Sequence, residues 1–122
     1  MKVYIASPYS HKDKGLQKLR SEMVTYLTAE LLERTPGLIT FGPITESHAY
    51  QEYRPSLGTG FEDWEKKDKL MLDNSDEIWV IMMKGWNKSI GVISEIEYAE
   101  KKKIPIRYLD PFEICPQLKE LL

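Results

Sequence analysis

The chain has 122 residues, the size of one domain, and we expect a single domain over residues 1–122. Hydrophobic residues make up 42% of the chain, which suffices for a packed core and excludes an intrinsically disordered protein. Seventeen lysines and arginines face nineteen aspartates and glutamates, a near balance that argues against a protein whose task is to bind the phosphate backbone of nucleic acid.

The cysteine content and the short apolar runs bear on location and cofactors. Cys115 is the single cysteine, so an internal disulfide is excluded and a reducing compartment is favoured. No apolar run approaches the roughly 20 residues that span a bilayer, and the first run, residues 3–6, is too short for a signal-peptide core. We expect a cytoplasmic protein with no membrane partner. His11 and His48 share no metal-ligand spacing with Cys115, and Gly-rich nucleotide motifs are missing, so we expect neither a metal nor a cofactor.

Hydrophobic periodicity and turn residues divide the chain into alternating strands and helices. Apolar residues at helical spacing between Leu16 and Leu31 predict a helix, and Ser10 and Asp13 favour a capping-box start for it. The stretch at 43–60 is predicted to be a long loop, a feature that often serves as a lid or binding loop. The predicted elements are strands at 2–6, 38–41, 77–82 and 104–109, and helices at 12–34, 61–72, 89–102 and within 110–122.

This alternation predicts an α/β fold with a parallel sheet of four to five strands and helices on both faces. With the first strand in the centre, we expect the strand order 2-1-3-4 of a flavodoxin-like or Rossmann-like three-layer domain. Ligands bind such sheets beyond the carboxyl ends of the strands, where the winding direction changes. The topology therefore predicts a site where Ser7, Pro8 and Tyr9 meet residues 85–91.

Asp68 breaks the pattern of its predicted helix. It lies four residues after Trp64 and four before Leu72, on an apolar stripe that also contains Phe61 and Met71. A carboxylate on a buried face is costly unless it is paired or protonated. Asp68 is therefore either a cap or salt-bridge partner of a lysine, or a carboxyl group with a raised pKa that can hold and donate a proton.

Glu95 lies on the border of the apolar stripe of the helix predicted at 89–102. Its neighbours one turn away are the small residues Gly91 and Ala99, which leave a slot where a ligand can approach the carboxylate. The alternative is an ordinary glutamate at the edge of the solvent-exposed face.

The entry to this helix is a candidate anion site. A helix N-terminus presents free N–H groups and a partial positive charge, Ser89 adds a hydroxyl, and Gly91 allows close approach to the backbone. Ser7 and Tyr9 are expected to face the same region. A simple N-cap by Asn87 or Ser89, and turn formation by Ser7, are the plain alternatives.

Aromatic residues offer weaker candidates. Tyr50 and Tyr53, with Arg54, either stack on a base and pair with an anion or pack within the protein. Trp79 is expected in the core, and Trp86 at the rim of the site.

Together these segments resemble the nucleoside 2-deoxyribosyltransferase superfamily, and in particular its nucleotide N-glycosidase branch and small phage and bacterial members. The resemblance covers about residues 1–109. It rests on the opening strand and turn at 4–9, on Asp68 followed by the strand entry at 76–80, on a Gly-Trp-x-x-Ser-x-Gly turn at 85–91, and on a Ser-x-Gly-x-x-x-Glu run at 89–95.

The resemblance implies that Glu95 is the nucleophile, which attacks the anomeric carbon of a nucleoside or nucleotide and forms a covalent glycosyl-enzyme intermediate. It implies that Asp68 lies near the base and manages the proton that the leaving base needs. Ser7, Ser89 and the Gly91 backbone would hold a 5′-phosphate. The implied partner is a small nucleoside or nucleotide, and the implied assembly is a homodimer or higher homo-oligomer.

Three hypotheses follow. The first is an enzyme that cleaves the N-glycosidic bond of a (deoxy)nucleoside 5′-monophosphate, with hydrolysis favoured over transfer of the sugar. The second is a module that binds or sequesters a nucleotide in the same pocket without turnover. The third is a structural domain whose unusual carboxylates are solvated. The apolar residues Phe112, Ile114, Leu118, Leu121 and Leu122 either form an interface or cap the sheet.

Overall fold

The computed structural model describes residues 1–121, and the side chains of residues 120 and 121 are outside the description. The strands are β1 (Lys2–Ala6), β2 (Ile39–Phe41), β3 (Glu77–Ile81) and β4 (Ile106–Leu109). The α-helices are α1 (Lys14–Arg34), α2 (Pro43–Tyr53), α3 (Phe61–Asp73), α4 (Ile90–Lys102) and α5 (Pro111–Ile114). Short 3-10 helices follow as η1 (Pro55–Leu57), η2 (Trp86–Lys88) and η3 (Pro116–Leu121).

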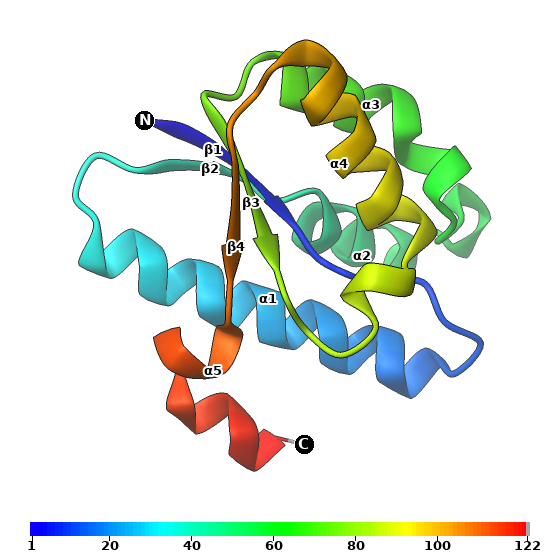
Figure 1. The fold of residues 1–122 in the computed structure, drawn as a ribbon. Coiled ribbons are helices and arrows are strands. Elements are labelled where there is room, and N and C mark those ends of the chain that lie inside the picture. Colours follow the sequence, from blue (N-terminus) through cyan, green and yellow to red (C-terminus); the bar gives the residue numbers. More distant parts are fainter. Residues whose placement is uncertain (122) are drawn as a thin grey trace.

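The four strands form one parallel sheet in the order β2-β1-β3-β4, which confirms the predicted α/β fold class and strand order (Figure 1). β1 pairs with β2 on one side, where Val3 lies opposite Thr40, and with β3 on the other, where Ile5 lies opposite Trp79. All four strands point the same way, so their carboxyl ends meet at one edge of the sheet. The segments that follow β1, β2 and β3 are therefore brought together at this edge.

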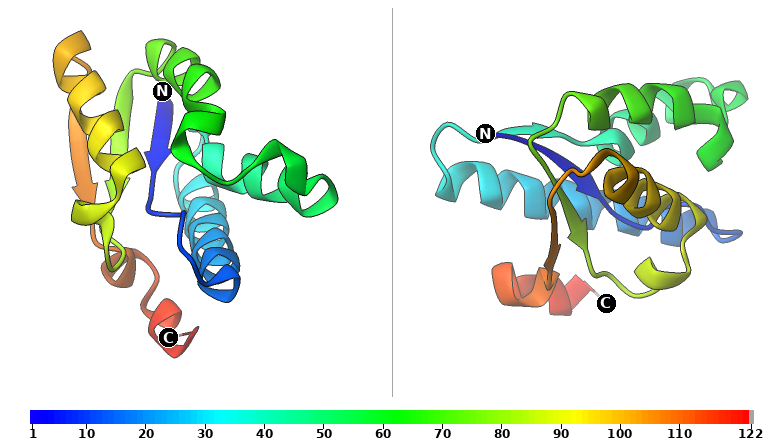
Figure 2. Two further views of the ribbon diagram at one scale, coloured as in Figure 1. Left: turned by 90° about the vertical axis from the view of Figure 1, so that its right-hand side faces the viewer. Right: turned by 45° about the horizontal axis from the view of Figure 1, so that its top comes forward.

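Each face of the sheet has its own hydrophobic core, with helices on both sides (Figure 2). Alternate residues of β1 point to opposite faces, so Val3 and Ile5 pack with α1 and the C-terminal helices, whereas Tyr4 and Ala6 pack with α3 and α4. Trp79 is buried in the first core, as the sequence predicts. The three-layer arrangement follows from this alternation.

One expectation about secondary structure is wrong. The long loop predicted at 43–60 is for the most part helical, with α2 at Pro43–Tyr53 and η1 at Pro55–Leu57. Proline at the first helical position has a φ angle suited to a helix and lacks an N–H group that would be unpaired there, so Pro43 begins α2. The helix places polar side chains against the rest of the fold, and for this reason it lacks the apolar stripe that reveals the other helices.

Smaller differences concern the ends of elements. The first helix begins at Lys14 with Asp13 as its N-cap, and the hydroxyl of Ser10 instead donates to the Thr59 carbonyl at 2.6 Å. Tyr26, expected on the inner stripe of that helix, is 45% exposed. The second and fourth strands begin one and two residues later than predicted, and the third ends one residue earlier.

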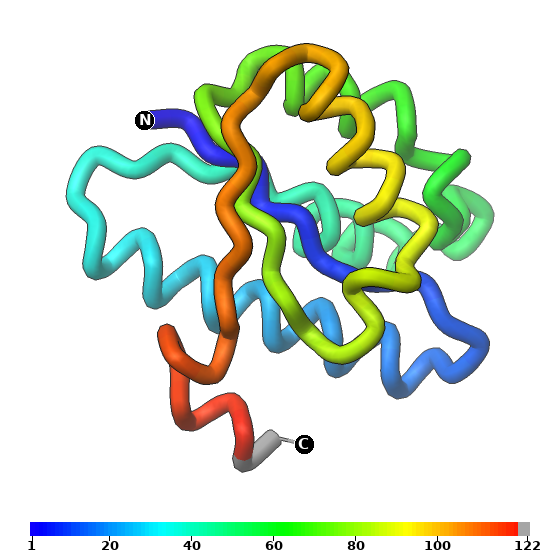
Figure 3. Tube along the Cα trace, viewed as in Figure 1, coloured from blue at the N-terminus to red at the C-terminus, as the bar shows by residue number. Residues whose placement is uncertain are grey.

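The C-terminal segment packs on its own domain (Figure 3). Of the two predicted roles, an interface or a cap on the sheet, this packing favours the cap. Leu118 is buried in the core beside α1, and Phe112 and Ile114 pack against that core. Leu121 and Leu122 lie outside the residues whose side chains the structure describes. None of the helices in the described part of the chain is both long and apolar enough to cross a membrane.

Candidate functional site

A cavity of about 310 Å³ opens at the carboxyl edge of the sheet, at the place that the topology predicts. The loop after β1, the helices α2 and α3, and the start of α4 each contribute to its wall. Six of the residues proposed from the sequence line this one cavity: Ser7, Tyr9, Asp68, Ser89, Gly91 and Glu95.

Glu95 belongs to the buried face of α4 and is 7% exposed. Its carboxyl group accepts a hydrogen bond from the hydroxyl of Tyr4, which is fully buried in the central strand. Burial raises the pKa of Glu95 to about 8, the hydrogen bond from Tyr4 works against this shift, and the charge of Asp68 adds to it. Glu95 is thus a buried carboxyl held by a tyrosine, and the alternative of an edge glutamate facing solvent is wrong.

Asp68 reaches the cavity from α3 and is 8% exposed. The structure gives its carboxyl group neither an ion pair nor a hydrogen bond with any described residue, so the salt-bridge alternative is also wrong. Burial raises its pKa to about 6; the nearby Lys67 ammonium opposes this shift and Glu46 adds to it. Lys67 itself is paired with Glu46, with 2.7 Å between ammonium and carboxylate. Asp68 therefore has the properties of a group that exchanges a proton near neutral pH.

The cavity also contains donors suited to an anion. The Ser7 hydroxyl is buried and has no hydrogen-bond partner among the described residues, although an unpaired buried polar group is costly. Lys88 and Ile90, at the start of α4, line the same cavity. The N-terminus of a helix of this length carries a partial positive charge. Ser89 is the N-cap of α4, and its hydroxyl accepts from the Val92 N–H at 3.3 Å. This confirms the prediction that Ser89 can serve as a simple N-cap.

Gly91 leaves room in the cavity wall. A Cβ atom at this position would approach Phe61 of α3 to 3.5 Å, an ordinary contact, so the glycine is not required by packing. Phe61 and Trp64 of α3, together with Ile44 of α2, give the cavity an apolar part. The short turn before α3 closes its edge, because Thr59 and Gly60 line the cavity.

Four residues proposed from the sequence do not line the cavity. Tyr50 lies on α2, where it is 50% exposed and its hydroxyl donates to the carboxylate of Glu46 at 3.2 Å. Tyr53 and Arg54 lie at the end of α2, where Tyr53 is 79% exposed and the Arg54 guanidinium donates to the Tyr53 carbonyl. Trp86 packs in the core near α4, with its ring centroid 5.6 Å from that of Tyr108. Tyr53 and Arg54 are thus exposed at the end of α2, outside the cavity.

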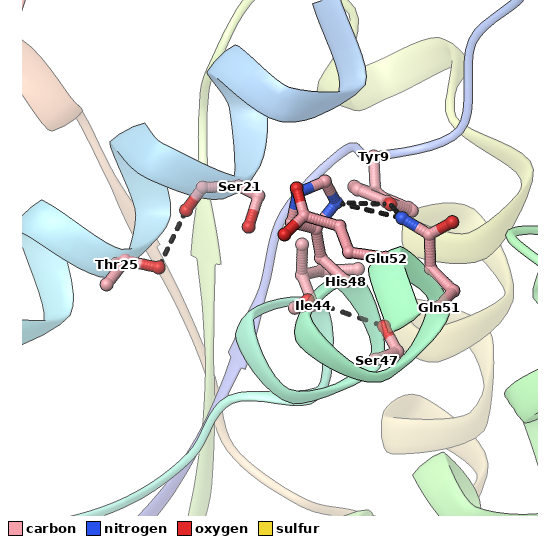
Figure 4. Close-up of polar contacts among 8 residues, drawn as sticks. All are labelled: Tyr9, Ser21, Thr25, Ile44, Ser47, His48, Gln51 and Glu52. Carbon is pink, nitrogen blue, oxygen red and sulfur yellow. Dashed lines mark hydrogen bonds and ion pairs between the residues drawn. The ribbon is translucent and has the colours of Figure 1, made fainter. Parts of the chain in front are cut away.

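The sequence analysis missed two features of the site. Tyr4 was assigned to the first strand without a role, although period-two alternation places it on the face that receives α4. The second feature is a hydrogen-bonded group on α2, which contains His48, Gln51 and Glu52 and surrounds the hydroxyl of Tyr9 (Figure 4). Helical spacing of residues 44, 47, 48 and 51 places them on one face of α2 and would have revealed this group.

No group of three or more histidine, cysteine, aspartate or glutamate side chains among those described, residues 1–119, is arranged to hold a metal ion.

Residues 1–110 match the family DUF1937, described as a domain of unknown function. The chain belongs to the DUF1937 family. The matched residues include all four strands and every residue that lines the cavity, so the site described above lies within the DUF1937 domain. A comparison with curated proteins finds no match.

Proposed function

We propose that the protein cleaves the N-glycosidic bond of a small nucleoside 5′-monophosphate, with Glu95 as nucleophile and Asp68 as proton donor. The observation that carries this proposal is the pair of buried carboxyl groups in one cavity, one held by Tyr4 and the other without a partner. Two carboxyl groups in different surroundings are what a double-displacement glycosidase needs. The resemblance to nucleoside 2-deoxyribosyltransferases supports the same assignment.

The reaction has two steps. A carboxylate oxygen of Glu95 forms a bond to C1′ of the sugar, while the bond from C1′ to the base nitrogen breaks and its electron pair stays with the base. The Asp68 carboxyl group gives its proton to the leaving base. A water molecule then attacks C1′, Asp68 takes a proton from it, and the bond to Glu95 breaks. The products are free base and sugar phosphate; a second base in place of water would give transfer.

The position of one proton is critical for this scheme. In the ligand-free protein the higher pKa is that of Glu95, so the proton resides there, whereas the first step needs it on Asp68. The hydrogen bond from Tyr4 favours the ionised form of Glu95. Positive charge that develops at C1′ favours it as well. The first step therefore requires that this proton pass from Glu95 to Asp68 once the substrate is bound.

The first experiment is chromatography of free base after incubation of the protein with a panel of ribo- and deoxyribonucleoside 5′-monophosphates. Release of base is expected from the wild-type protein. Glu95→Gln should reduce the rate by on the order of 1,000-fold or more, because the nucleophile is lost. The matched control is Glu97→Gln, which changes an exposed glutamate on the same helix and should leave the rate unchanged.

The outcomes separate the hypotheses. Base release that survives Glu95→Gln would overturn the nucleophile assignment. Tight binding of a monophosphate without base release from the wild-type protein would indicate the sequestering module, in which Glu95 has no chemical task. Neither binding nor release would contradict both proposals.

A second experiment addresses the 5′-phosphate. We infer that Ser7 and the N-terminus of α4 hold this group, because the Ser7 hydroxyl has no partner among the described residues and lines the cavity. Ser7→Ala should raise KM for a nucleoside monophosphate and change KM for the corresponding nucleoside little. An equal change for both substrates would contradict the assignment. Cytoplasmic location and assembly as a homodimer or higher oligomer remain predictions.

A further inference from the structure

A polar network on α2 surrounds the hydroxyl of Tyr9 (Figure 4). The Tyr9 oxygen lies 2.6 Å from Nδ1 of His48 and 3.2 Å from the side-chain nitrogen of Gln51. On the other side of the imidazole ring, Nε2 of His48 lies 2.9 Å from a carboxylate oxygen of Glu52. Tyr9 is buried and lines the cavity, whereas half of the Glu52 side chain is exposed, so the network extends from the cavity to solvent.

The partners of His48 determine its protonated nitrogen. A carboxylate only accepts hydrogen bonds, so Nε2 carries a hydrogen and donates it to Glu52. In a neutral ring that carries its hydrogen on Nε2, Nδ1 carries none, and its one lone pair faces the Tyr9 hydroxyl at 2.6 Å. The carboxylate of Glu52 therefore favours the Nε2–H tautomer of the neutral ring.

This tautomer fixes the direction of the Tyr9 hydroxyl. Burial raises the pKa of Tyr9, so the phenol keeps its proton, and that proton points to Nδ1 of His48. The Tyr9 oxygen accepts one hydrogen bond from Gln51. Since a phenolic oxygen has two lone pairs, one remains free. For a ligand group that reaches its hydroxyl, Tyr9 is therefore an acceptor with no hydrogen left to donate.

The topology places this acceptor on the base side of the proposed substrate. β1 lies between β2 and β3, so α2, which follows β2, and α4, which follows β3, contribute to the cavity from opposite sides of β1. Glu95 and the helix N-terminus proposed to hold the phosphate belong to α4, and Ser7 directly follows β1. A substrate with its phosphate at the start of α4 and C1′ at Glu95 extends its base across β1 toward Tyr9, Ile44 and Ser47.

We propose that Tyr9, fixed by His48 and Glu52, selects bases that carry an exocyclic amino group over bases that carry a carbonyl at the same position. An amino group donates to the free lone pair of Tyr9, whereas a carbonyl oxygen would face another acceptor with no hydrogen between them. Tyr9 is the specificity-determining residue, and His48 and Glu52 are positioning residues. This inference rests on the proposed function, because it places a nucleotide in the cavity.

The test measures equilibrium binding in the Glu95→Gln background, where no cleavage interferes. The probes are two pairs of 5′-monophosphates that differ in this one group: cytidine against uridine, and adenosine against inosine. We expect the amino member of at least one pair to bind about 10- to 100-fold more tightly. Tyr9→Phe and His48→Ala should each bring the ratio of the dissociation constants of the two members of a pair close to one. Tyr53→Phe, which changes an exposed tyrosine outside the cavity, should leave it unchanged.

A second readout needs no ligand. Nitrogen-15 NMR of the wild-type protein should show His48 as the Nε2–H tautomer, and Glu52→Gln should reduce the population of that tautomer. Detection of the Nδ1–H tautomer would overturn the inference. A ratio unaffected by Tyr9→Phe, or a preference for the carbonyl member, would overturn it as well. If base is released from monophosphates but Tyr9→Phe does not change the binding ratio, the proposed function stands and this inference alone fails. If no monophosphate binds, both fail.

Discussion

At the Glu95 carboxyl group, burial and hydrogen bonding act on the pKa in opposite directions. Burial raises the pKa to about 8, because the charged form loses its hydration, and the hydrogen bond from Tyr4 limits this rise. The same burial raises the pKa of Tyr4 well above its ordinary value, so the tyrosine keeps the proton that it donates. A buried carboxyl that is protonated at neutral pH has consequences for stability as well as for chemistry.

The first prediction concerns stability against pH. Between the ordinary pKa of 4.5 and the folded value of about 8, the folded protein keeps a proton on Glu95 that the unfolded chain has released. The free energy of unfolding therefore falls as pH rises through this window. Glu95→Gln removes this titration. The fall in the free energy of unfolding across this pH window should therefore be smaller in the variant, by on the order of a few kcal/mol. Urea denaturation across pH 5 to 8 measures it, with Glu97→Gln as control; identical slopes in both variants would contradict the prediction.

The second prediction concerns Tyr4. Tyr4→Phe removes the hydrogen bond that favours the charged form of Glu95 and leaves its burial in place. The pKa of Glu95 should therefore rise above its value in the wild-type protein. Carbon-13 NMR titration of the glutamate carboxyl groups reports this pKa directly. Tyr26→Phe, at a half-exposed position on α1, is the control, and a fall in the pKa after Tyr4→Phe would show that the phenol has the opposite effect.

At the scale of elements, the helices and strands that have a regular apolar pattern were predictable from the sequence. The four strands and the helices α1, α3 and α4 each bury apolar residues at the spacing of their type, so their existence and order follow. Helix α2 was not predictable in this way. The side chains on its inner face are Ile44, Ser47, His48 and Gln51, which are mostly polar and satisfied by hydrogen bonds.

The same distinction applies to the site. Asp68 and Glu95 stood out because a carboxylate interrupts or borders an apolar stripe, and both line the cavity. Tyr53 and Arg54 were proposed on the assumption of a loop, and a helix directs them elsewhere. Tyr4 could not be assigned from its own strand, because its partner Glu95 is 91 residues away and only the folded sheet brings them together.

The third prediction concerns the turn before α3. Gly58 has a φ of 82° and Gly37 a φ of 84°, values that other residues adopt only with strain. An added Cβ at Gly37 would meet no atom within 4 Å, but at Gly58 it would clash with the carboxylate of Asp63, which accepts from the Gly60 N–H at 2.9 Å. Gly37→Ala should cost about 1–2 kcal/mol of unfolding free energy. Gly58→Ala should cost about 1 kcal/mol more, because the bond between Asp63 and Gly60 is also lost.

Urea denaturation of the two glycine variants provides the comparison. Gly58 combines its positive φ with a ψ of 166°, a conformation essentially restricted to glycine, so the difference between the variants reports this backbone strain together with the clash at Asp63. Gly58→Ala should also weaken ligand binding, since Thr59 and Gly60 line the cavity, whereas Gly37→Ala should not. Equal destabilisation by the two variants would show that the turn adjusts without losing its hydrogen bond.

At the scale of the whole molecule, one face of the sheet carries the candidate site and the other is closed by packed helices. The face with α3 and α4 carries both carboxyl groups of the candidate site. The other face is closed by α1 and by the C-terminal helices, where Cys115 and Leu118 are buried. These two residues lie beyond the span that matches the DUF1937 family, yet they complete one of the two cores.

The last prediction tests this division. Leu118→Ala removes a side chain that is 1% exposed and should lower the free energy of unfolding by roughly 2–5 kcal/mol, through lost burial and the cavity left behind. Gln117→Ala, at the exposed neighbouring position, should change it by less than about 0.5 kcal/mol. Because no described residue after Leu109 lines the candidate site, the Leu118 variant should bind the proposed nucleotide ligand with unchanged affinity at temperatures where it is folded. Denaturation and calorimetric binding on the same sample measure both effects. A loss of affinity in the folded variant would show that the two faces are coupled through the sheet.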